Sequence, residues 1–263
     1  MATIQYPELV NNYLTFCNYA EEARKSNSLD LRWCNFLFPT TLLPLGVLLQ
    51  TRKIKYLKPH STNVSNYIDL ITGKLSSYDV GGLSYVPFVS LPANQEKTSD
   101  VFSALYKLHN DGKEYGGEDA FKYIIGELVD NIYEHSEFKH ALVMAQKYAK
   151  KEFVEICIYD DGVTIGGGFR KHGINVDDEN AITQAILGKS TKSEERGYGL
   201  STSIAIFTQG LHGEILIVSG SAGLYLGKQR NLYKFKEVHK LQGTLISIRV
   251  PYPAQKVNIY DFI

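Results

Sequence analysis

Three polar residues recur at four-residue intervals within one segment of the chain. They are Glu127, Asn131 and His135, so on a helix their side chains lie in one row. A carboxylate, a carboxamide and an imidazole in such a row suit a general base, a metal ligand and a contact to phosphate, respectively. Amphipathic helices also commonly carry polar residues beside their buried face. From the row alone, a catalytic site and a solvated helix border are both open.

A second polar group follows the predicted strand FVEICIY. The strand ends in Asp160, Asp161 and Gly162, and more glycines follow at positions 166–168. An acid at a strand end, beside glycines that let a ligand approach the backbone, can accept a hydrogen bond from an exocyclic amine such as that of adenine. A turn rich in Asp and Gly is also a common end for a strand. This pattern too has two interpretations.

Two further glycine motifs come later in the chain. Gly197, Gly199 and Leu200 form a G-x-G-L motif at the start of the predicted helix LSTSIAIFTQ. Free N–H groups at a helix start favour anionic oxygens, and glycines let a ligand approach the backbone closely. Gly243 and Thr244 then open the last predicted strand, GTLISIRV. Each motif is a weak signal, and the order of all four carries the information.

The order and spacing of the four motifs resemble those of the GHKL ATPase superfamily, whose members share the Bergerat nucleotide-binding fold. The resemblance covers roughly residues 98–253. It implies an α/β sandwich, with a mixed, mainly antiparallel sheet and helices on one face, that binds ATP and Mg²⁺. Within the superfamily, ELVDNIYEHS is similar to the N box of the anti-sigma-factor serine kinases.

The resemblance implies a role for each residue of the first two motifs. Glu127 would be the base that orients or activates the attacking group, Asn131 would hold Mg²⁺, and His135 would lie near the phosphates. Asp160 would bind the adenine amino group, and Gly162 would give the backbone room for it.

The later motifs would complete the nucleotide site. Thr244 would contact adenine through a water, and Gly197, Gly199 and Leu200 would lie beside the phosphates. The segment between residues 166 and 196 would form the ATP lid, with a short helix capped by Asp177 or Asp178. Lid residues that could reach the γ-phosphate are Ser190, Thr191, Lys192 and Arg196, although a solvated surface explains each of them as well.

Two features of the sequence limit these comparisons. Thr164 stands where the superfamily usually has the second glycine of its first glycine box, and this would alter the floor of the adenine site. The segment LGKST resembles the end of a Walker A loop, but Thr183 stands where that loop requires its first glycine. The sequence therefore does not predict a P-loop.

The elements that must position these residues follow from hydrophobic periodicity. A helix capped by Asp119 is predicted from Ala120, and its apolar residues recur at helical spacing. Strands at 140–148 and 151–159 predict a hairpin that turns at 149–151. Further predicted elements are a helix over 200–209 that ends at Gly210 and strands at 213–220, 232–238 and 243–250.

The N-terminal part predicts a smaller α/β module. A strand over 28–39 is followed by a helix over 40–53, with Thr40 or Thr41 as its cap and Pro44 in its first turn. This order resembles part of a STAS-like domain, although an ordinary βα unit explains it nearly as well. Turn residues around position 95 predict two domains, 1–95 and 96–263.

The charge balance argues against partners that bind through a strong net field. Lys and Arg number 28, as do Asp and Glu, so no field would steer the chain onto nucleic acid or an anionic membrane. The most apolar stretch, residues 36–49, is shorter than the roughly 20 residues of a membrane span. The N-terminus lacks a signal-peptide pattern, and the three cysteines do not suit a disulfide framework. We therefore predict a cytoplasmic protein with no nucleic-acid or membrane partner.

Together these features predict an ATP-binding protein of the GHKL class. It would act as a Mg²⁺-dependent ATPase or as a serine/threonine protein kinase in a bacterial-type regulatory switch, with a regulatory protein or a second copy of the chain as partner. The alternative is a non-catalytic module, in which ATP orders the lid and so gates a protein contact. No histidine is followed by the pattern of a phosphoacceptor helix, which argues against an autophosphorylating histidine kinase.

Overall fold

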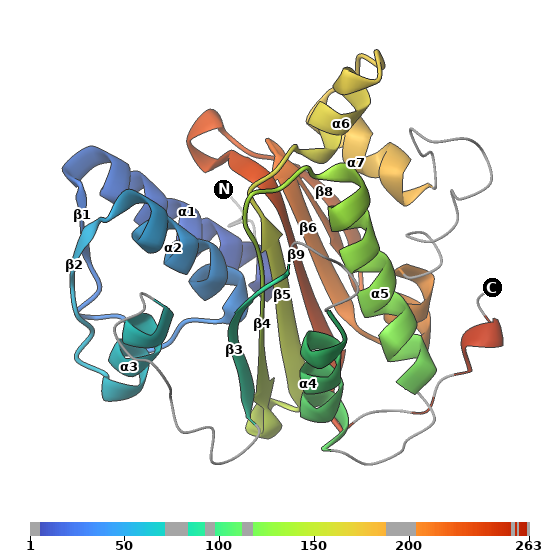
Figure 1. Cartoon of the computed structure of the whole chain (residues 1–263), viewed down its shortest axis with the longest axis horizontal. Helices are drawn as coiled ribbons and strands as arrows, with labels where there is room; N and C mark the ends of the chain where they lie inside the picture. The colour runs from blue at the N-terminus through green and yellow to red at the C-terminus, as the bar shows by residue number, and fades with distance from the viewer. Residues whose placement is uncertain are drawn as a thin grey trace, which may run out of the picture. The chain divides into compact units, whose positions relative to one another are not determined.

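The chain contains two compact units, Met1–Gly82 and Leu83–Ile263 (Figure 1). The structure is a computed structural model that describes residues 6–71, 84–92, 98–111, 118–187, 204–253, 256 and 258–261. The sequence predicts the division near residue 95, but it falls earlier, between Gly82 and Leu83. The reason is that strand β3 (Tyr85–Ser90) pairs with strand β4 (Ala141–Tyr148) of the second unit.

The first unit is an α/β module with a short parallel sheet. Its elements are α1 (Glu8–Ser26), β1 (Ser28–Asp30), α2 (Pro39–Arg52), β2 (Lys55–Leu57) and α3 (Thr62–Ile71). β1 pairs with β2 in parallel, with Leu29 opposite Tyr56. α2 packs on α1, where the Thr41 hydroxyl donates a hydrogen bond to the Asn12 carbonyl at 2.7 Å. The resemblance of this unit to a STAS-like domain stays a prediction.

Several details of the first unit differ from the prediction. The strand predicted over 28–39 ends at Asp30, and helix α2 begins at Pro39. Pro39 therefore occupies the first turn, where its fixed φ and missing N–H suit the helix start, and Pro44 lies inside the helix. The N-cap is Phe38, without a side-chain capping bond, so neither Thr40 nor Thr41 is the cap.

The second unit contains a seven-stranded sheet in the order β3-β4-β5-β9-β6-β7-β8. The prediction was a mixed, mainly antiparallel sheet. In the structure every pairing between neighbouring strands of this sheet is antiparallel. The β4–β5 hairpin turns at Ala149–Lys151, which confirms the predicted turn. The remaining strands are β5 (Phe153–Asp160), β6 (Glu214–Gly220), β7 (Ala222–Leu226), β8 (Arg230–Lys234) and β9 (Leu241–Pro251).

Helices cover one face of this sheet, which confirms the predicted α/β sandwich (Figure 1). They are α4 (Ser99–Asn110), α5 (Glu118–His135), α6 (Ile165–Lys171) and α7 (Asp178–Ile186). The apolar face of α5 is buried as predicted, with Leu128 and Val129 at most 2% exposed. α5 already includes Glu118, so Asp119 lies within the helix and is not its cap.

Some elements of the second unit were predicted incompletely or not at all. β3 and β7 have no counterpart in the prediction, and β8 ends at Lys234 although the predicted strand extends to 238. The described part of the helix predicted over 200–209 ends in a π-helical turn, Ile206–Gly210, which confirms the predicted end. Its predicted start lies outside the described residues.

Within the described part of the chain, no helix is both long enough and apolar enough to span a membrane.

Candidate functional site

Three polar side chains form a row across the central strands of the second unit. Asp160 ends β5, Thr244 lies opposite it on β9, and Ser219 of β6 lies opposite Thr244. Alternate residues of a strand point to opposite faces, and Ile158 and Ile246, two residues from Asp160 and Thr244, belong to the core beneath the helices. The row therefore lies on the helix-covered face, at one end of the sheet.

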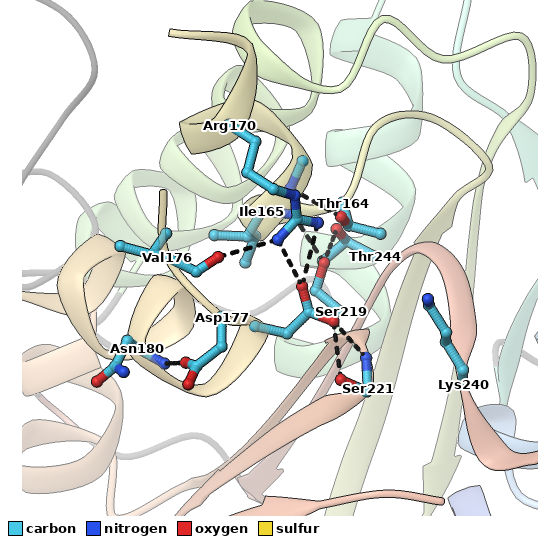
Figure 2. Close-up of polar contacts among 12 residues, drawn as sticks. Thr164, Ile165, Arg170, Val176, Asp177, Asn180, Ser219, Ser221, Lys240 and Thr244 are labelled. Atoms are coloured by element: carbon cyan, nitrogen blue, oxygen red, sulfur yellow. Dashed lines mark hydrogen bonds and ion pairs between the residues drawn. The ribbon is translucent and has the colours of Figure 1, made fainter. Parts of the chain in front are cut away.

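Hydrogen bonds join Ser219 and Thr244 of this row to each other and to the start of α6 (Figure 2). The Ser219 and Thr244 hydroxyl oxygens are 3.0 Å apart. The backbone N–H of Ile165 donates to Ser219 Oγ at 2.9 Å, and the Gly243 carbonyl lies 3.2 Å from the same oxygen. The two hydroxyls thus belong to one connected network.

The carboxyl group of Asp160 is held almost entirely away from solvent. The residue is 1% exposed, and burial raises its pKa to about 7. Hydrogen bonds from the Gly162 backbone, at 2.9 Å, and from the Ser136 side chain act in the opposite direction, because they favour the ionised form. Asp160 is therefore an acid whose charge is easily removed near neutral pH.

Two glycines let the backbone close around Asp160. A Cβ on Gly162 would lie 2.0 Å from the Ser136 carbonyl oxygen. Gly243 has a φ of +81°, and a Cβ there would lie 1.9 Å from the Asp160 carbonyl oxygen. Both contacts involve backbone atoms, which cannot move aside as a flexible side chain could. Local packing against Ser136 therefore requires glycine at position 162, a reason other than the predicted approach of a ligand.

Asp161 makes different contacts from those of Asp160. Its carboxylate accepts hydrogen bonds from the backbone N–H groups of Lys139 and His140 at 2.9 and 2.8 Å, and lies 2.7 Å from His140 Nδ1. Burial would raise its pKa, but these hydrogen bonds lower the pKa overall. Asp161 ties down the segment after α5, so the two adjacent carboxylates diverge.

Helix α5 carries the predicted row of Glu127, Asn131 and His135. The Asn131 side-chain amide donates to the Glu127 carbonyl at 2.7 Å. Glu127 is half-buried, and burial, followed by the nearby charges of Asp130 and Glu134, raises its pKa. His135 Nε2 lies 3.8 Å from the Glu134 carboxylate.

The end of α5 connects this row to the Asp160 turn. Ser136 follows the last residue of the helix, and its carbonyl accepts a hydrogen bond from Val163 N–H at 2.5 Å. The same carbonyl oxygen leaves no room for a side chain at position 162. The helix bearing Glu127 and the strand end bearing Asp160 therefore meet at Ser136.

A third set of contacts anchors the segment that the sequence assigns to the base of the lid (Figure 2). Asp178, at the start of α7, accepts hydrogen bonds from the Ser221 backbone and hydroxyl at 2.8 and 2.9 Å. Arg170 of α6 lies 3.4 Å from the other Asp178 oxygen and donates to the Val176 carbonyl at 3.0 Å. Helices α6 and α7 are thus attached to the β6–β7 turn.

The helix caps in this segment explain two predicted positions. Asp177 caps α7 by accepting a hydrogen bond from Asn180 N–H at 2.8 Å, which decides between the two predicted caps. Thr164, the departure from the GHKL pattern, caps α6 by accepting from Gly167 N–H at 2.9 Å. The threonine therefore has a structural role that a glycine side chain could not perform.

Seven residues predicted for the site or its lid lie outside the described part of the chain: Ser190, Thr191, Lys192, Arg196, Gly197, Gly199 and Leu200. The structure in turn places two serines in the site that the sequence analysis missed. Ser219 was visible in principle, because it continues the alternation of Ile215 and Ile217 and so puts a hydroxyl on the core face. Ser136 had no comparable signal, since its contact to the Gly162 turn arises only in the folded chain.

The described residues contain no group of three or more His, Cys, Asp and Glu side chains that could hold a metal ion.

No family model, curated protein or solved structure matches this chain. The resemblance to GHKL ATPases therefore stays a prediction from the order of the sequence motifs.

Proposed function

We propose that the chain binds ATP with Mg²⁺ in the manner of GHKL proteins, and that it is an ATPase or a serine/threonine protein kinase of a bacterial-type regulatory switch. The observation that carries the proposal is the pairing of Asp160 with Thr244 at one end of the central strands. It places a carboxylate and a hydroxyl side by side, beside the helix that carries Glu127 and Asn131.

This pair complements the edge of an adenine base. Adenine presents a donor, its exocyclic amine, next to an acceptor, its ring nitrogen N1. An ionised Asp160 can only accept a hydrogen bond, and the Thr244 hydroxyl can donate one. Thr244 is 8% exposed, whereas Asp160 is 1% exposed, so we expect the base to approach over Thr244.

The α5 row offers groups suited to the phosphates and the metal. The Asn131 amide nitrogen is engaged by the Glu127 carbonyl, which leaves the amide oxygen as the atom that can face a cation. An amide oxygen fits Mg²⁺, whose other ligands are typically phosphate oxygens and water. When bound, Mg²⁺ would neutralise charge on the phosphates. His135, one turn further along α5, would lie near these phosphates.

Glu127 is the residue that favours catalysis over passive binding. Its raised pKa, caused by burial and by the acidic side chains of Asp130 and Glu134, brings the carboxylate closer to the strength of an effective base near neutral pH. It would take a proton from water in an ATPase, or from an acceptor hydroxyl in a kinase.

The alternative, an ATP-gated interaction module, is favoured by the contacts at the base of the predicted lid. Asp178 and Ser221 hold helices α6 and α7 on the sheet. ATP bound against this segment could thereby present a new surface to a partner protein. Turnover of ATP separates the two candidates.

The test follows ADP release and ATP affinity for the wild type, Glu127→Gln and the matched control Glu152→Gln. Glu152 is exposed and lies before the first residue of β5, at the end opposite Asp160. Loss of turnover in Glu127→Gln alone, with ATP affinity retained, is the expected result. Binding without turnover in all three proteins would favour the interaction module. If the wild type bound no ATP in calorimetry, the proposal would be wrong.

A further inference from the structure

The Ser219 hydroxyl has a defined place in a chain of hydrogen bonds. A backbone N–H can only donate, and the Ile165 N–H donates to Ser219 Oγ at 2.9 Å. Ser219 must therefore give its own proton to another acceptor. Two lie within reach, the Thr244 hydroxyl oxygen at 3.0 Å and the Gly243 carbonyl oxygen at 3.2 Å.

The choice between these acceptors decides what Thr244 can offer a ligand. If Ser219 donates to Thr244, the Thr244 proton is directed away from Ser219. If Ser219 donates to Gly243, its oxygen is open to the Thr244 proton, and a Thr244 hydroxyl that donates to Ser219 can only accept from a ligand. The contact to Thr244 is the shorter one and lies nearer to the preferred O–H···O distance. A ligand atom that can only accept also selects the first arrangement, because hydroxyl protons rotate to suit their partners.

We infer that Ser219 is a positioning residue that makes the Thr244 hydroxyl a donor toward the acceptor nitrogen N1 of a purine. This inference rests on the proposed function. The chain of donors runs from Ile165 N–H through Ser219 and Thr244 to the base, either directly or through one water. Ser219 acts through Thr244, because it is only 1% exposed and lies behind Thr244 in the row.

The arrangement distinguishes adenine from guanine. Adenine has a donor at position 6 and an acceptor at N1, whereas guanine has an acceptor at position 6 and a donor at N1. With Asp160 as acceptor and Thr244 held as donor, the two contacts match adenine and oppose guanine in the same orientation. Ser219 therefore contributes to the choice of base without touching it.

The test compares ATP with 1-deaza-ATP, in which a C–H group replaces N1. Calorimetry measures the affinity of both ligands for the wild type, Ser219→Ala and Thr244→Val. We expect the wild type to prefer ATP by about fivefold to tenfold, the value of one hydrogen bond. Ser219→Ala should lose most of this preference by weakening ATP, with the affinity for 1-deaza-ATP unchanged within about twofold.

A matched control separates positioning from general destabilisation. Ser247→Ala removes a fully buried hydroxyl from the opposite face of β9, and it should leave the ratio of the two affinities unchanged. In the double variant Ser219→Ala/Thr244→Val, the loss of ATP affinity should equal that of Thr244→Val alone, since Ser219 acts through Thr244. If Ser219→Ala loses its cooperative thermal unfolding, Ser219→Cys is measured instead. Cysteine is close to serine in size, and its S–H group is only a weak hydrogen-bond donor.

Equal weakening of both ligands in Ser219→Ala, or no weakening of either, would overturn the inference while leaving ATP binding intact. An additive loss in the double variant would also overturn it. A wild type that bound neither ligand would reject the proposed function itself, and the inference with it.

Discussion

Asp160 and Thr244 lie directly opposite one another on neighbouring antiparallel strands, and both side chains point to the helix-covered face of the sheet. Asp160 is the only acidic member of the row that they form with Ser219. We expect Asp160→Asn to lower the affinity for ATP by at least about tenfold, because an ionised acceptor for the adenine amine is lost. Calorimetry checks this, with Glu152→Gln as the control. Unchanged affinity in Asp160→Asn would contradict the assignment.

The pKa of Asp160 also predicts how stability depends on pH. Burial raises this pKa in the folded state from 3.8 to about 7, so the folded protein binds a proton more tightly than the unfolded chain. Protonated Asp160 thus favours the folded state. Its contribution to the free energy of unfolding is fully present below about pH 4 and is lost as the pH rises through about 7. The loss is on the order of 4 kcal/mol at most, from about 1.4 kcal/mol per pKa unit.

Asp160→Asn isolates this contribution from those of other titrating groups. Urea unfolding of the wild type and the variant between pH 4 and 8 should show the variant gaining free energy of unfolding relative to the wild type as the pH rises. A constant difference across that range would show that the Asp160 carboxyl does not titrate there.

Asn131 is expected to link ATP binding to magnesium. Asn131→Ala should bind ATP with nearly the same affinity in the presence and absence of Mg²⁺, because it lacks the amide oxygen that would contact the cation. The wild type should bind more tightly with Mg²⁺ present. Asn180→Ala, on the exposed surface of α7, is the control and should keep the magnesium effect. If Mg²⁺ increased the ATP affinity of Asn131→Ala as much as that of the wild type, Asn131 would not be the magnesium ligand.

Gly243 should not tolerate a side chain. With φ at +81° and a Cβ only 1.9 Å from the Asp160 carbonyl oxygen, Gly243→Ala must shift the β5–β9 backbone. We expect a loss of about 2–4 kcal/mol in the free energy of unfolding. Gly168→Ala provides the comparison, because nothing lies within 4 Å of its Cβ position in α6, and it should be neutral or slightly stabilising. Similar losses in both variants would argue against the close contact at Gly243.

The Asp178 contact to Ser221 should stabilise the attachment of α6 and α7. Asp178→Asn weakens two hydrogen bonds to the β6–β7 turn and removes the charge that faces Arg170. We expect a loss of about 1–3 kcal/mol and faster hydrogen exchange in α6 and α7. Asp177→Asn should change little, because Asn caps a helix as well as Asp does. Equal exchange rates in wild type and Asp178→Asn would show that the contact is not needed.

Local patterns in the sequence were sufficient to predict the elements that depend on neighbouring residues. The apolar spacing of α5 and the turn of the β4–β5 hairpin depend on residues a few positions apart, and the same kind of pattern narrowed the cap of α7 to Asp177 or Asp178. Helical periodicity and capping chemistry act over this same range, and they can therefore be recognised in the sequence without a structure. The Glu127, Asn131 and Asp160 candidates came from such patterns combined with the resemblance to GHKL ATPases.

Contacts between distant parts of the chain decided the rest. β3 joins the second unit by pairing with β4, more than fifty residues later, and this moves the boundary before residue 95. β9 inserts between β5 and β6, and only this order brings Thr244 between Asp160 and Ser219. Strand pairing depends on which hydrophobic faces meet in the folded core, and a strand's own residues do not specify its partner. The hydrogen-bond chain through Ser219 is therefore a property of the tertiary structure.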